Sequence, residues 1–383
     1  MTHPAGHAPK VLIVAGEASG DLHGSLLVRE MLSLHPAIHF YGIGGNKMQE
    51  AGVKLLAHAA DIGVVGGTEV IAKLGTFIKV IRKITRSMDQ FKPDLVILID
   101  FPDFNLNIVA RAAKKRSIKI FYYISPQLWA WRSGRVKQIK RRVNRMAVIL
   151  PFEVDFYAAR GFAVEYVGHP LVDTVKTNLT KSEARREFGL DEHKTTLGLL
   201  PGSRSAEISR LLPEMLNAAK IISEKIPGAQ YILPLADTLK EEAVRSILAA
   251  SGLNVKIVAG RTYDAIGCCD LALVTSGTAT LETGLLAVPM IIIYKLSFFS
   301  ALIGSLIIHV KHIGLVNIVA GKTVVPELIQ LNANGPRIAS EALAILFNDE
   351  KKQEIITELK NIRTKMGKPG AARRAAQMAF DMI

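Results

Sequence analysis

The sequence predicts an α/β protein made of two doubly wound, Rossmann-like halves, and three observations support this fold class. Short apolar runs of strand length alternate with helical patterns in both halves of the chain. Several of these runs end in turns rich in glycine and serine, as is typical of the ligand-binding edge of a parallel sheet. The chain has 383 residues, more than the ~250–300 at which single cores usually stop growing, and a polar segment near 171–194 separates the halves.

The composition predicts a folded protein that has an anionic partner. Hydrophobic residues make up 49% of the chain, which supplies an ample core. The formal net charge of +14 points to nucleic acid, acidic lipid or phosphorylated substrates, and charge alone does not choose among them. The two cysteines, Cys268 and Cys269, are adjacent, so no disulfide framework or zinc site is expected, and a reducing compartment fits.

The ends and apolar segments of the chain predict a cytoplasmic protein that can associate with a membrane. The N-terminus, MTHPAGHAPK, lacks the apolar region of a signal peptide. The most lipid-like segment, Leu296–Ile308, is shorter than the ~18 apolar residues of a spanning helix and lies between Lys295 and Lys311. We therefore expect it to be buried or interfacial.

The first half opens with a strand, a small-residue turn and a helix. Val11–Ala15 is an apolar strand that runs into GEASGD, where Glu17, Ser19 and Gly20 lie, and a helix with a regular apolar face follows. This order is typical of nucleotide-binding openings. The turn is not GxGxxG, however, and no acidic residue follows a second strand at the spacing that a dinucleotide site needs, which argues against a dehydrogenase.

Two aspartates follow the most apolar strand. Leu95–Ile99 has the continuous apolar character of a central parallel strand. Asp100 stands at its carboxyl end, where open α/β sheets bind their ligands, and Asp103 follows Pro102. We expect Asp103 to cap the helix that continues from Asn105, and Asp100 to be the better candidate for a general base.

Glu69–Met88 reads as an amphipathic helix. Its apolar face carries Val70, Ile71, Leu74, Phe77, Ile78, Ile81, Ile84 and Met88. Its opposite face carries Lys79, Arg82, Lys83 and Arg86. Two interpretations stay open, namely a surface helix packed on the core and a helix that lies on an anionic membrane.

A second basic segment contains both tryptophans of the protein. Trp129 and Trp131 lie in SPQLWAWR, and seven basic residues follow with no acidic residue among them: Arg132, Arg135, Lys137, Lys140, Arg141, Arg142 and Arg145. Such a segment can bind nucleic acid, sit at a lipid interface or surround a phosphorylated substrate. A solvated helix is the simpler alternative.

The second half restarts the same alternation. We expect strands near Leu197–Leu200, Tyr231–Leu235, Val255–Val258, Leu271–Thr275 and Met290–Ile293. The turn LPGSR follows the first of these, and the main-chain N–H groups of Gly202 and Ser203 can face an anion while Arg204 pairs with phosphate oxygens. A tight turn with a solvated arginine is the alternative. Because Pro213 interrupts the next helical pattern, we expect the main helix to begin near it.

A second small turn lies in SGTATLE. Ser276, Gly277 and Thr278 separate the strand Leu271–Thr275 from a helix that Ala279 and Thr280 continue and Pro289 closes. The positive end of that helix can bind phosphate, and Glu282, one turn further on, can accept hydrogen bonds from ribose or sugar hydroxyls. An ordinary βαβ crossover is the alternative. We expect Asn317, in LVNIVAG, to contact a ligand from a loop.

Five blocks in this order resemble the lipid-A-disaccharide synthase family of GT-B glycosyltransferases. The blocks are GEASGD, IDFPDFN, SPQLWAWR, LPGSR and SGTATLE, and the resemblance covers nearly the whole chain. GEASGD and SPQLWAWR are specific to that family, whereas LPGSR and SGTATLE are shared more widely among GT-B enzymes that use UDP-sugars. Phe101 stands where other members often have a smaller residue.

The resemblance implies a fold, a reaction and a location. The fold would be GT-B, with two Rossmann-like domains facing a central cleft. The reaction would transfer 2,3-diacylglucosamine from its UDP derivative to 2,3-diacylglucosamine 1-phosphate, giving UDP and a β-1,6-linked disaccharide 1-phosphate in Gram-negative bacteria. Family members attach peripherally to the inner face of the cytoplasmic membrane. Asp100 corresponds to an essential aspartate, and Arg204 and the SGTATLE turn to groups that hold UDP.

The expected mechanism inverts the anomeric centre. Asp100 would remove the proton of the acceptor 6-hydroxyl, an effect typically worth ~10²–10⁴-fold in rate. Arg204, the Ser203 backbone and the helix opening at Thr278–Ala279 would stabilise the leaving diphosphate, so no cofactor or metal is expected. Glu282 would take the ribose hydroxyls. Glu17, Ser19, Gly20 and Asp103 would lie on the acceptor side.

The domain prediction has three parts. Residues 1–175 would form the acceptor and lipid side, residues 190–355 the UDP-sugar donor side, and residues 356–383 a helical tail packed back on the chain or on the partner subunit of a homodimer. The rival functions are a UDP-sugar 2-epimerase or an N-acetylglucosaminyltransferase with the same fold, and a nucleic-acid-binding protein. No nucleic-acid-binding motif accompanies the basic tract, so no nucleic acid partner is expected.

Overall fold

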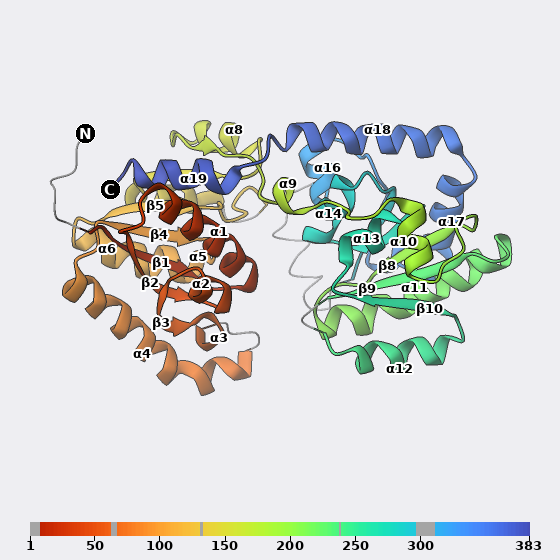
Figure 1. The fold of residues 1–383 in the computed structure, drawn as a ribbon, viewed down its shortest axis with the longest axis horizontal. Coiled ribbons are helices and arrows are strands. Elements are labelled where there is room, and N and C mark those ends of the chain that lie inside the picture. The colour runs from red at the N-terminus through yellow and green to blue at the C-terminus, as the bar shows by residue number, and fades with distance from the viewer. Residues whose placement is uncertain (1–7, 63–66, 131–132, 237–238, 296–310) are drawn as a thin grey trace. The chain divides into compact units, whose positions relative to one another are not determined.

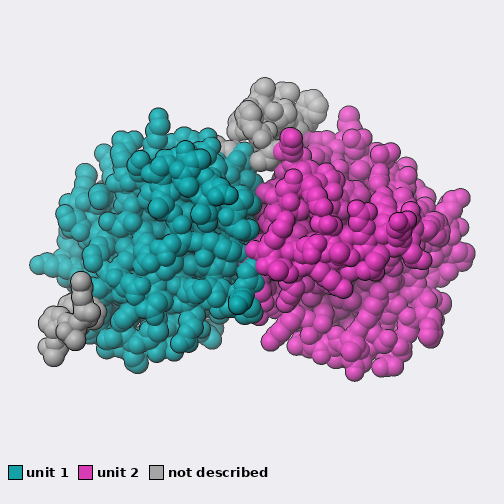
Figure 2. All heavy atoms as spheres, turned by 90° about the horizontal axis from the view of Figure 1, so that it is seen from above, with its two compact units in different colours: residues 1–170, 367–383 teal, residues 171–366 magenta. Residues whose placement is uncertain are grey.

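The computed structural model describes residues 8–62, 67–130, 133–236, 239–295 and 311–383. The chain divides into two compact units, shown in Figure 2. Unit 1 consists of Met1–Pro170 and Gly367–Ile383, and unit 2 of Leu171–Met366. Unit 2 is therefore inserted into unit 1 near the end of the chain.

Unit 1 is built on a parallel sheet of seven strands in the order β3-β2-β1-β4-β5-β6-β7. The strands are β1 (Lys10–Ala15), β2 (His39–Gly44), β3 (Lys54–His58), β4 (Leu95–Ile99), β5 (Lys119–Tyr123), β6 (Arg145–Val148) and β7 (Glu165–Tyr166). β1 and β4 lie at the centre and are almost entirely buried, as their continuous apolar sequences require. The strand order reverses between them, which is the switch point where doubly wound sheets bind ligands.

The helices of unit 1 surround this sheet (Figure 1). They are α1 (Ala18–Leu34), α2 (Asn46–Glu50), α3 (Ala59–Ile62), α4 (Gly67–Phe91), α5 (Pro102–Phe104), α6 (Arg111–Lys115), α7 (Val136–Arg142), α8 (Glu153–Ala158) and α19 (Ala371–Phe380). A π-helical segment, Asn105–Ala110, joins α5 to α6. In α4 the side chains of Val80, Ile84 and Met88 belong to the core. This part of α4 is therefore a surface helix packed on the core, whereas the side chains before Gly75 lie outside the described residues.

Unit 2 repeats the same topology with six parallel strands in the order β10-β9-β8-β11-β12-β13. The strands are β8 (Thr196–Leu200), β9 (Gln230–Leu235), β10 (Val255–Ala259), β11 (Leu271–Thr275), β12 (Met290–Tyr294) and β13 (Glu327–Ile329). The described helices are α9 (Leu171–Thr174), α10 (Lys181–Glu187), α11 (Ser205–Lys225), α12 (Glu241–Ser251), α13 (Thr262–Gly267), α14 (Thr278–Leu285), α16 (Leu315–Ala320), α17 (Gly335–Leu346) and α18 (Asp349–Lys365). The reversal of strand order falls between β8 and β11, so their carboxyl ends form the candidate binding edge.

The predicted α/β fold class is confirmed, and the expected strands of the second half coincide with β8 to β12 to within a residue. The predicted start of the main helix near Pro213 is wrong, because α11 begins at Ser205 and continues through Pro213. A proline removes one helical N–H, but the apolar face of α11, with Ile208, Leu212 and Met215 buried, keeps the helix continuous.

The polar segment 171–194 is structured. It contains α9 and α10, and Thr180 and Glu183 form a capping box at the start of α10. The division between the units falls at its first residue, Leu171. Residues 356–383, which we expected to act as one tail, are shared between the units: α18 belongs to unit 2, and α19 packs on α1 in unit 1.

Within the described ranges no helix is long and apolar enough to cross a membrane. The apolar segment Leu296–Ile308 lies outside the described residues.

Candidate active site

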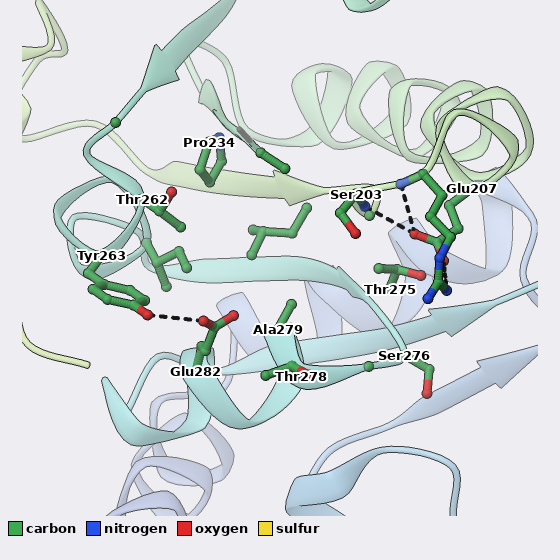
Figure 3. Close-up of a pocket in the computed structure, with 17 residues that line it drawn as sticks. Ser203, Glu207, Pro234, Thr262, Tyr263, Thr275, Ser276, Thr278, Ala279 and Glu282 are labelled. Atoms are coloured by element: carbon green, nitrogen blue, oxygen red, sulfur yellow. Dashed lines mark hydrogen bonds and ion pairs between the residues drawn. The ribbon is translucent and has the colours of Figure 1, made fainter. Parts of the chain in front are cut away.

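Unit 2 contains a cavity of about 590 Å³ at the carboxyl ends of β8 and β11 (Figure 3). The turn after β8, the turn after β11 and the start of α13 form its walls. Its lining residues are Leu200, Gly202, Ser203, Arg204, Glu207, Pro234, Ala236, Gly260, Thr262, Tyr263, Ile266, Thr275, Ser276, Gly277, Thr278, Ala279 and Glu282. The structure therefore brings the LPGSR and SGTATLE turns to one site, as the switch-point rule predicts.

The carboxylate of Glu207 accepts hydrogen bonds from the groups of the LPGSR turn that we expected to bind an anion. The N–H groups of Ser203 and Arg204 donate to Glu207 Oε2 at 3.0 and 3.3 Å, and Arg204 Nη1 donates to Oε1 at 3.0 Å. Gly202 is required here, because its φ is +115° and a Cβ would come within 2.2 Å of Glu207 Oε2. The turn is thus arranged around carboxylate oxygens supplied by the first turn of α11.

The SGTATLE turn presents main-chain donors to the cavity. Within the described residues no acceptor is recorded for the N–H groups of Gly277, Thr278 and Ala279, at the start of α14. These N–H groups and the helix dipole favour an anion at this end of the helix. Ser276 Oγ donates to the carbonyl oxygen of Ile313 at 2.9 Å, which fixes the turn.

Thr280 does not line the cavity, although it was expected to belong to the donor site. Its side chain is fully buried, and its hydroxyl donates to the carbonyl oxygen of Gly277 at 2.8 Å. Thr280 therefore stabilises the turn from its buried side and is not available to a ligand in the cavity.

Glu282 lies one turn into α14 and is paired with a tyrosine that the sequence pattern did not identify. The hydroxyl of Tyr263 donates to Glu282 Oε1 at 3.0 Å (Figure 3). Burial raises the pKa of Glu282 above its usual range. Tyr263 lies in RTYDAIG, which carries no recognisable motif, so only the fold reveals this pair.

The predicted loop position of Asn317 is wrong. Asn317 lies in α16 and is fully buried. Its Nδ2 donates to Val325 O and Glu327 Oε1, and its Oδ1 accepts from the N–H groups of Val324 and Val325. The side chain joins α16 to the segment before β13 and does not line the cavity.

Asp100 stands at the switch point of unit 1, half-buried, with a backbone φ of +43°. Two side chains hold its carbonyl oxygen: Tyr122 Oη donates to it at 2.6 Å and Asn105 Nδ2 at 2.8 Å. Burial, followed by the nearby carboxylate of Glu17, raises the pKa of Asp100 to about 6. A carboxylate with this pKa is a stronger base than an exposed one.

The neighbouring turn after β1 approaches the Asp100 segment closely. Phe101 also has a positive φ, +47°, and its ring packs against Gly16, where a Cβ would come within 2.3 Å of the ring. Glu17 and Ser19 are exposed, and Gly20 is buried beneath them. GEASGD and IDFPDFN therefore meet at one edge of the sheet.

Asp103 does not cap the following helix. That helix begins at Pro102, with Phe101 as its N-cap, so Asp103 lies in the first turn. Its side chain is exposed and forms an ion pair with Arg135. The expectation of a cap failed because the chain turns into the helix two residues earlier than the sequence pattern indicates.

Asp21, at the end of GEASGD, is a buried structural carboxylate. It accepts hydrogen bonds from the N–H groups of Gly45 at 2.7 Å, Lys47 at 3.1 Å and Met48 at 3.0 Å. It thereby fixes the start of α2 to α1, which supports the turn that carries Glu17 and Ser19.

Three arginines of the basic tract are held by residues outside the tract. Arg135 pairs with Asp103, Arg142 Nη1 donates to Leu106 O, and Arg145 pairs with Glu165. Trp131 and Arg132 lie outside the described residues. In the part of the chain that the structure describes, no group of three His, Cys, Asp or Glu side chains is placed to hold a metal ion.

Comparison with known proteins identifies the family. The family model described as lipid-A-disaccharide synthetase matches residues 11–381. The chain belongs to the lipid-A-disaccharide synthase family. The lipid-A-disaccharide synthase of Syntrophus aciditrophicus is 56% identical over 374 residues, covering 97% of both chains. That of Geobacter metallireducens is 47% identical over 380 residues, covering 99% of both chains.

Solved structures show the same GT-B fold. The S. aureus MnaA–UDP co-structure has a TM-score of 0.65 at 11% identity and covers 98% of both chains. Acinetobacter baumannii MurG has a TM-score of 0.60 at 15% identity and covers 97% of this chain and 99% of that one. At these identities the likeness concerns the fold alone. The function follows from the lipid-A-disaccharide synthase family: the chain is a UDP-sugar glycosyltransferase of lipid A biosynthesis.

Proposed function

We propose that the cavity of unit 2 binds the UDP part of the donor and that Asp100 is the general base of the transfer. The reaction moves 2,3-diacylglucosamine from UDP-2,3-diacylglucosamine to 2,3-diacylglucosamine 1-phosphate. The observation that carries the donor assignment is the meeting of the LPGSR turn, the SGTATLE turn and Glu282 around one cavity of about 590 Å³. Among proteins of the same fold, S. aureus MnaA was solved with UDP.

The diphosphate would lie between the start of α14 and Arg204. The N–H groups of Gly277, Thr278 and Ala279 would donate hydrogen bonds to its oxygens, as helix openings commonly do. Arg204, whose side chain is 76% exposed, would turn from Glu207 to the phosphates. In this structure Glu207 Oε2 accepts hydrogen bonds from the N–H groups of Ser203 and Arg204. Phosphate oxygens of the donor would replace this carboxylate oxygen as the acceptor of those bonds.

The nucleoside would lie on the opposite side of the cavity, toward α13. Glu282 would accept hydrogen bonds from the ribose hydroxyls, while Tyr263 Oη holds its carboxylate in place at 3.0 Å. This pairing leaves Glu282 Oε2 for the ligand.

Transfer would proceed by in-line displacement. The acceptor 6-hydroxyl gives its proton to Asp100, its oxygen forms the bond to the anomeric carbon, and the bond from that carbon to the diphosphate breaks with its electron pair leaving on UDP. At neutral pH a carboxyl with a pKa of about 6 is mostly ionised and still retains an affinity for the proton. Asp103 is the less suitable base, because it is exposed and engaged with Arg135.

We also propose that the protein attaches peripherally to an anionic membrane surface, the inner face of the cytoplasmic membrane. Both substrates carry acyl chains and therefore reside in or beside lipid, and the net charge of +14 favours an anionic surface. Ile81 packs against the core of unit 1, so it is unsuited as a reporter of lipid contact. Ile78, with 40% of its surface exposed, is the better position for a charge substitution.

Mass spectrometry of the product tests the reaction. The protein is mixed with UDP-2,3-diacylglucosamine and 2,3-diacylglucosamine 1-phosphate, and we expect a tetraacyl disaccharide 1-phosphate together with UDP. The Asp100→Ala variant should give little disaccharide while still binding UDP in calorimetry. Full activity of that variant would remove Asp100 from the mechanism.

A further inference from the structure

Unit 1 contains a second cavity, of about 610 Å³, between the edge strand β3 and helix α4. The two elements run beside each other at one side of the sheet (Figure 1). We call it the β3–α4 cavity, and its lining residues are Lys54, Leu55, Leu56, Lys79, Arg82, Lys83, Arg86, Ser87, Gln90 and Phe91. Half of them are basic and none is acidic, a composition that points to an anionic ligand.

The four basic residues of α4 that line the cavity are spaced to form one charged face. Lys79 and Lys83 are four residues apart, as are Arg82 and Arg86, so each side chain has like-charged neighbours on adjacent turns of the helix. Like charges at this spacing destabilise a helix unless an anion lies among them. Lys54, from β3, adds a fifth positive charge on the opposite wall.

No carboxylate neutralises these five side chains within the described part of the chain. None of them takes part in a recorded ion pair or side-chain hydrogen bond. The nearest acidic residue on the helix, Asp89, is held by Arg116 through two hydrogen bonds of 2.6 and 2.7 Å. The Ser87 hydroxyl turns inward to Ile84 O at 2.8 Å. The charges are therefore free to meet an external anion.

The cavity also has an apolar wall. Leu55, Leu56 and Phe91 are half-buried and line it, and the ring of Phe91 is fixed edge-on against Tyr41 with centroids 5.0 Å apart. A small inorganic anion would leave this wall unused. An anionic phosphate joined to a less polar glycerol and acyl part would use both surfaces.

We propose that the β3–α4 cavity binds the phosphate headgroup of an anionic phospholipid. The phosphate lies among the basic residues of α4 and Lys54, and the glycerol end of the lipid contacts Leu55 and Phe91. This inference rests on the proposed membrane association and deepens it, because it replaces a diffuse attraction between the protein and the surface with a defined headgroup site.

The test compares two double substitutions that change the net charge equally. Arg82→Glu with Arg86→Glu reverses the charge of two of the five basic side chains that line the cavity. Lys114→Glu with Lys115→Glu is the matched control, since both lysines are exposed on α6 and neither lines the cavity. Flotation with phosphatidylcholine vesicles, with and without phosphatidylglycerol, measures lipid binding. We expect the cavity variant to lose roughly tenfold or more in affinity for the anionic vesicles, and the control to lose much less.

A third variant separates the lipid from free phosphate. Leu55→Ser should weaken vesicle binding and leave the binding of inorganic phosphate, followed by calorimetry, unchanged. Equal losses in the two double variants, or no loss in either, would overturn the headgroup site. Vesicle binding unaffected by Leu55→Ser, together with phosphate binding that needs Arg82 and Arg86, would assign the cavity to a free phosphate instead.

Glycosyl transfer with detergent-dispersed substrates distinguishes this inference from the proposed function. Both double variants should retain the wild-type rate, which also shows that they are folded. A raised KM for 2,3-diacylglucosamine 1-phosphate in the cavity variant alone would mean that the cavity holds the acceptor phosphate, and would refute the phospholipid assignment. If the wild-type protein transferred sugar but bound to no vesicle in the flotation assay, the proposed headgroup site would be refuted. The proposed donor site would be unaffected by that result.

Discussion

The hydroxyl of Tyr122 donates a hydrogen bond of 2.6 Å to the carbonyl oxygen of Asp100. Tyr122 lies on β5, and Asp100 follows the neighbouring strand β4. The bond holds the main chain at the point where Asp100 and Phe101 adopt positive φ angles, which residues with side chains seldom do. A fully buried side chain thereby fixes the direction of the proposed base without touching its carboxylate.

Tyr122→Phe should therefore lower kcat more than it changes the KM for either substrate. The carbonyl oxygen keeps its bond from Asn105, so the loss of folding stability should be about 1 kcal/mol, as for one neutral hydrogen bond. Steady-state kinetics together with thermal unfolding measure both quantities. Unchanged kcat in a protein that has lost this stability would assign Tyr122 a purely structural role.

The pH profile should report Asp100. Its pKa of about 6 means that the carboxylate is present above that pH and protonated below it. We expect kcat/KM to fall roughly tenfold per pH unit below about 6. Asp103→Asn should retain this limb of the profile. If substitution of Asp103, and not of Asp100, removed the fall of kcat/KM at low pH, Asp103 would be the general base.

Asp100→Asn should be more stable than the wild type at neutral and alkaline pH. The folded carboxyl has a pKa of about 6 against an ordinary 3.8, so its favourable contribution is present below pH 3.8 and is lost as the pH rises through 6. Ionisation of the folded group costs on the order of 2–3 kcal/mol, which the amide avoids. Denaturant unfolding at about pH 8 and about pH 4 measures the difference, which should vanish at the lower pH. An Asp100→Asn variant that is less stable than the wild type at both pH values would contradict the destabilisation that we attribute to the buried, ionised carboxylate.

Arg204→Ala should weaken UDP binding by about 1.5–3 kcal/mol, the range of a hydrogen bond to a charged group. Arg210→Ala is the matched control, because Arg210 is exposed on α11, the helix that follows Arg204, and does not line the cavity. Calorimetry with UDP gives both affinities. Equal affinities for the two variants would place the diphosphate away from the LPGSR turn.

Asn317→Ala should cost about 2–4 kcal/mol of unfolding free energy, because it leaves the N–H groups of Val324 and Val325 and the carbonyl oxygen of Val325 without the Asn317 side chain as partner. Asn332→Ala, at an exposed position, should change stability little. If Asn317→Ala kept full stability and lost UDP affinity instead, Asn317 would belong to the ligand site after all.

The fold could be predicted from the sequence because parallel strands buried on both faces leave a strong local signal. Leu95–Ile99 and Leu271–Thr275 are such continuous apolar runs, and their turns consist of small residues. Both predicted donor turns meet at one cavity because topology alone brings the carboxyl ends of β8 and β11 together.

The errors have a different origin, namely contacts between residues far apart in the chain. Pro213 reads locally as a helix breaker, yet its buried neighbours on α11 keep the helix intact. Asn317 reads as an available polar side chain, but Val324, Val325 and Glu327 use all its hydrogen-bonding capacity. The pair of Tyr263 and Glu282 spans 19 residues without a shared motif. In each of these cases the outcome depends on packing contacts in the folded chain, and a local sequence pattern carries no information on those contacts.

The packing of α19 on α1 has a consequence for synthesis on the ribosome. All residues of unit 2 emerge before Gly367, whereas unit 1 receives its last helix only when Ala371–Phe380 has left the exit tunnel. The inserted unit can therefore complete its fold first, in reverse of the usual N-terminal-first order. Until α19 has been made, the face of α1 that it covers stays bare, so unit 1 cannot be completed before all of unit 2 has been synthesised.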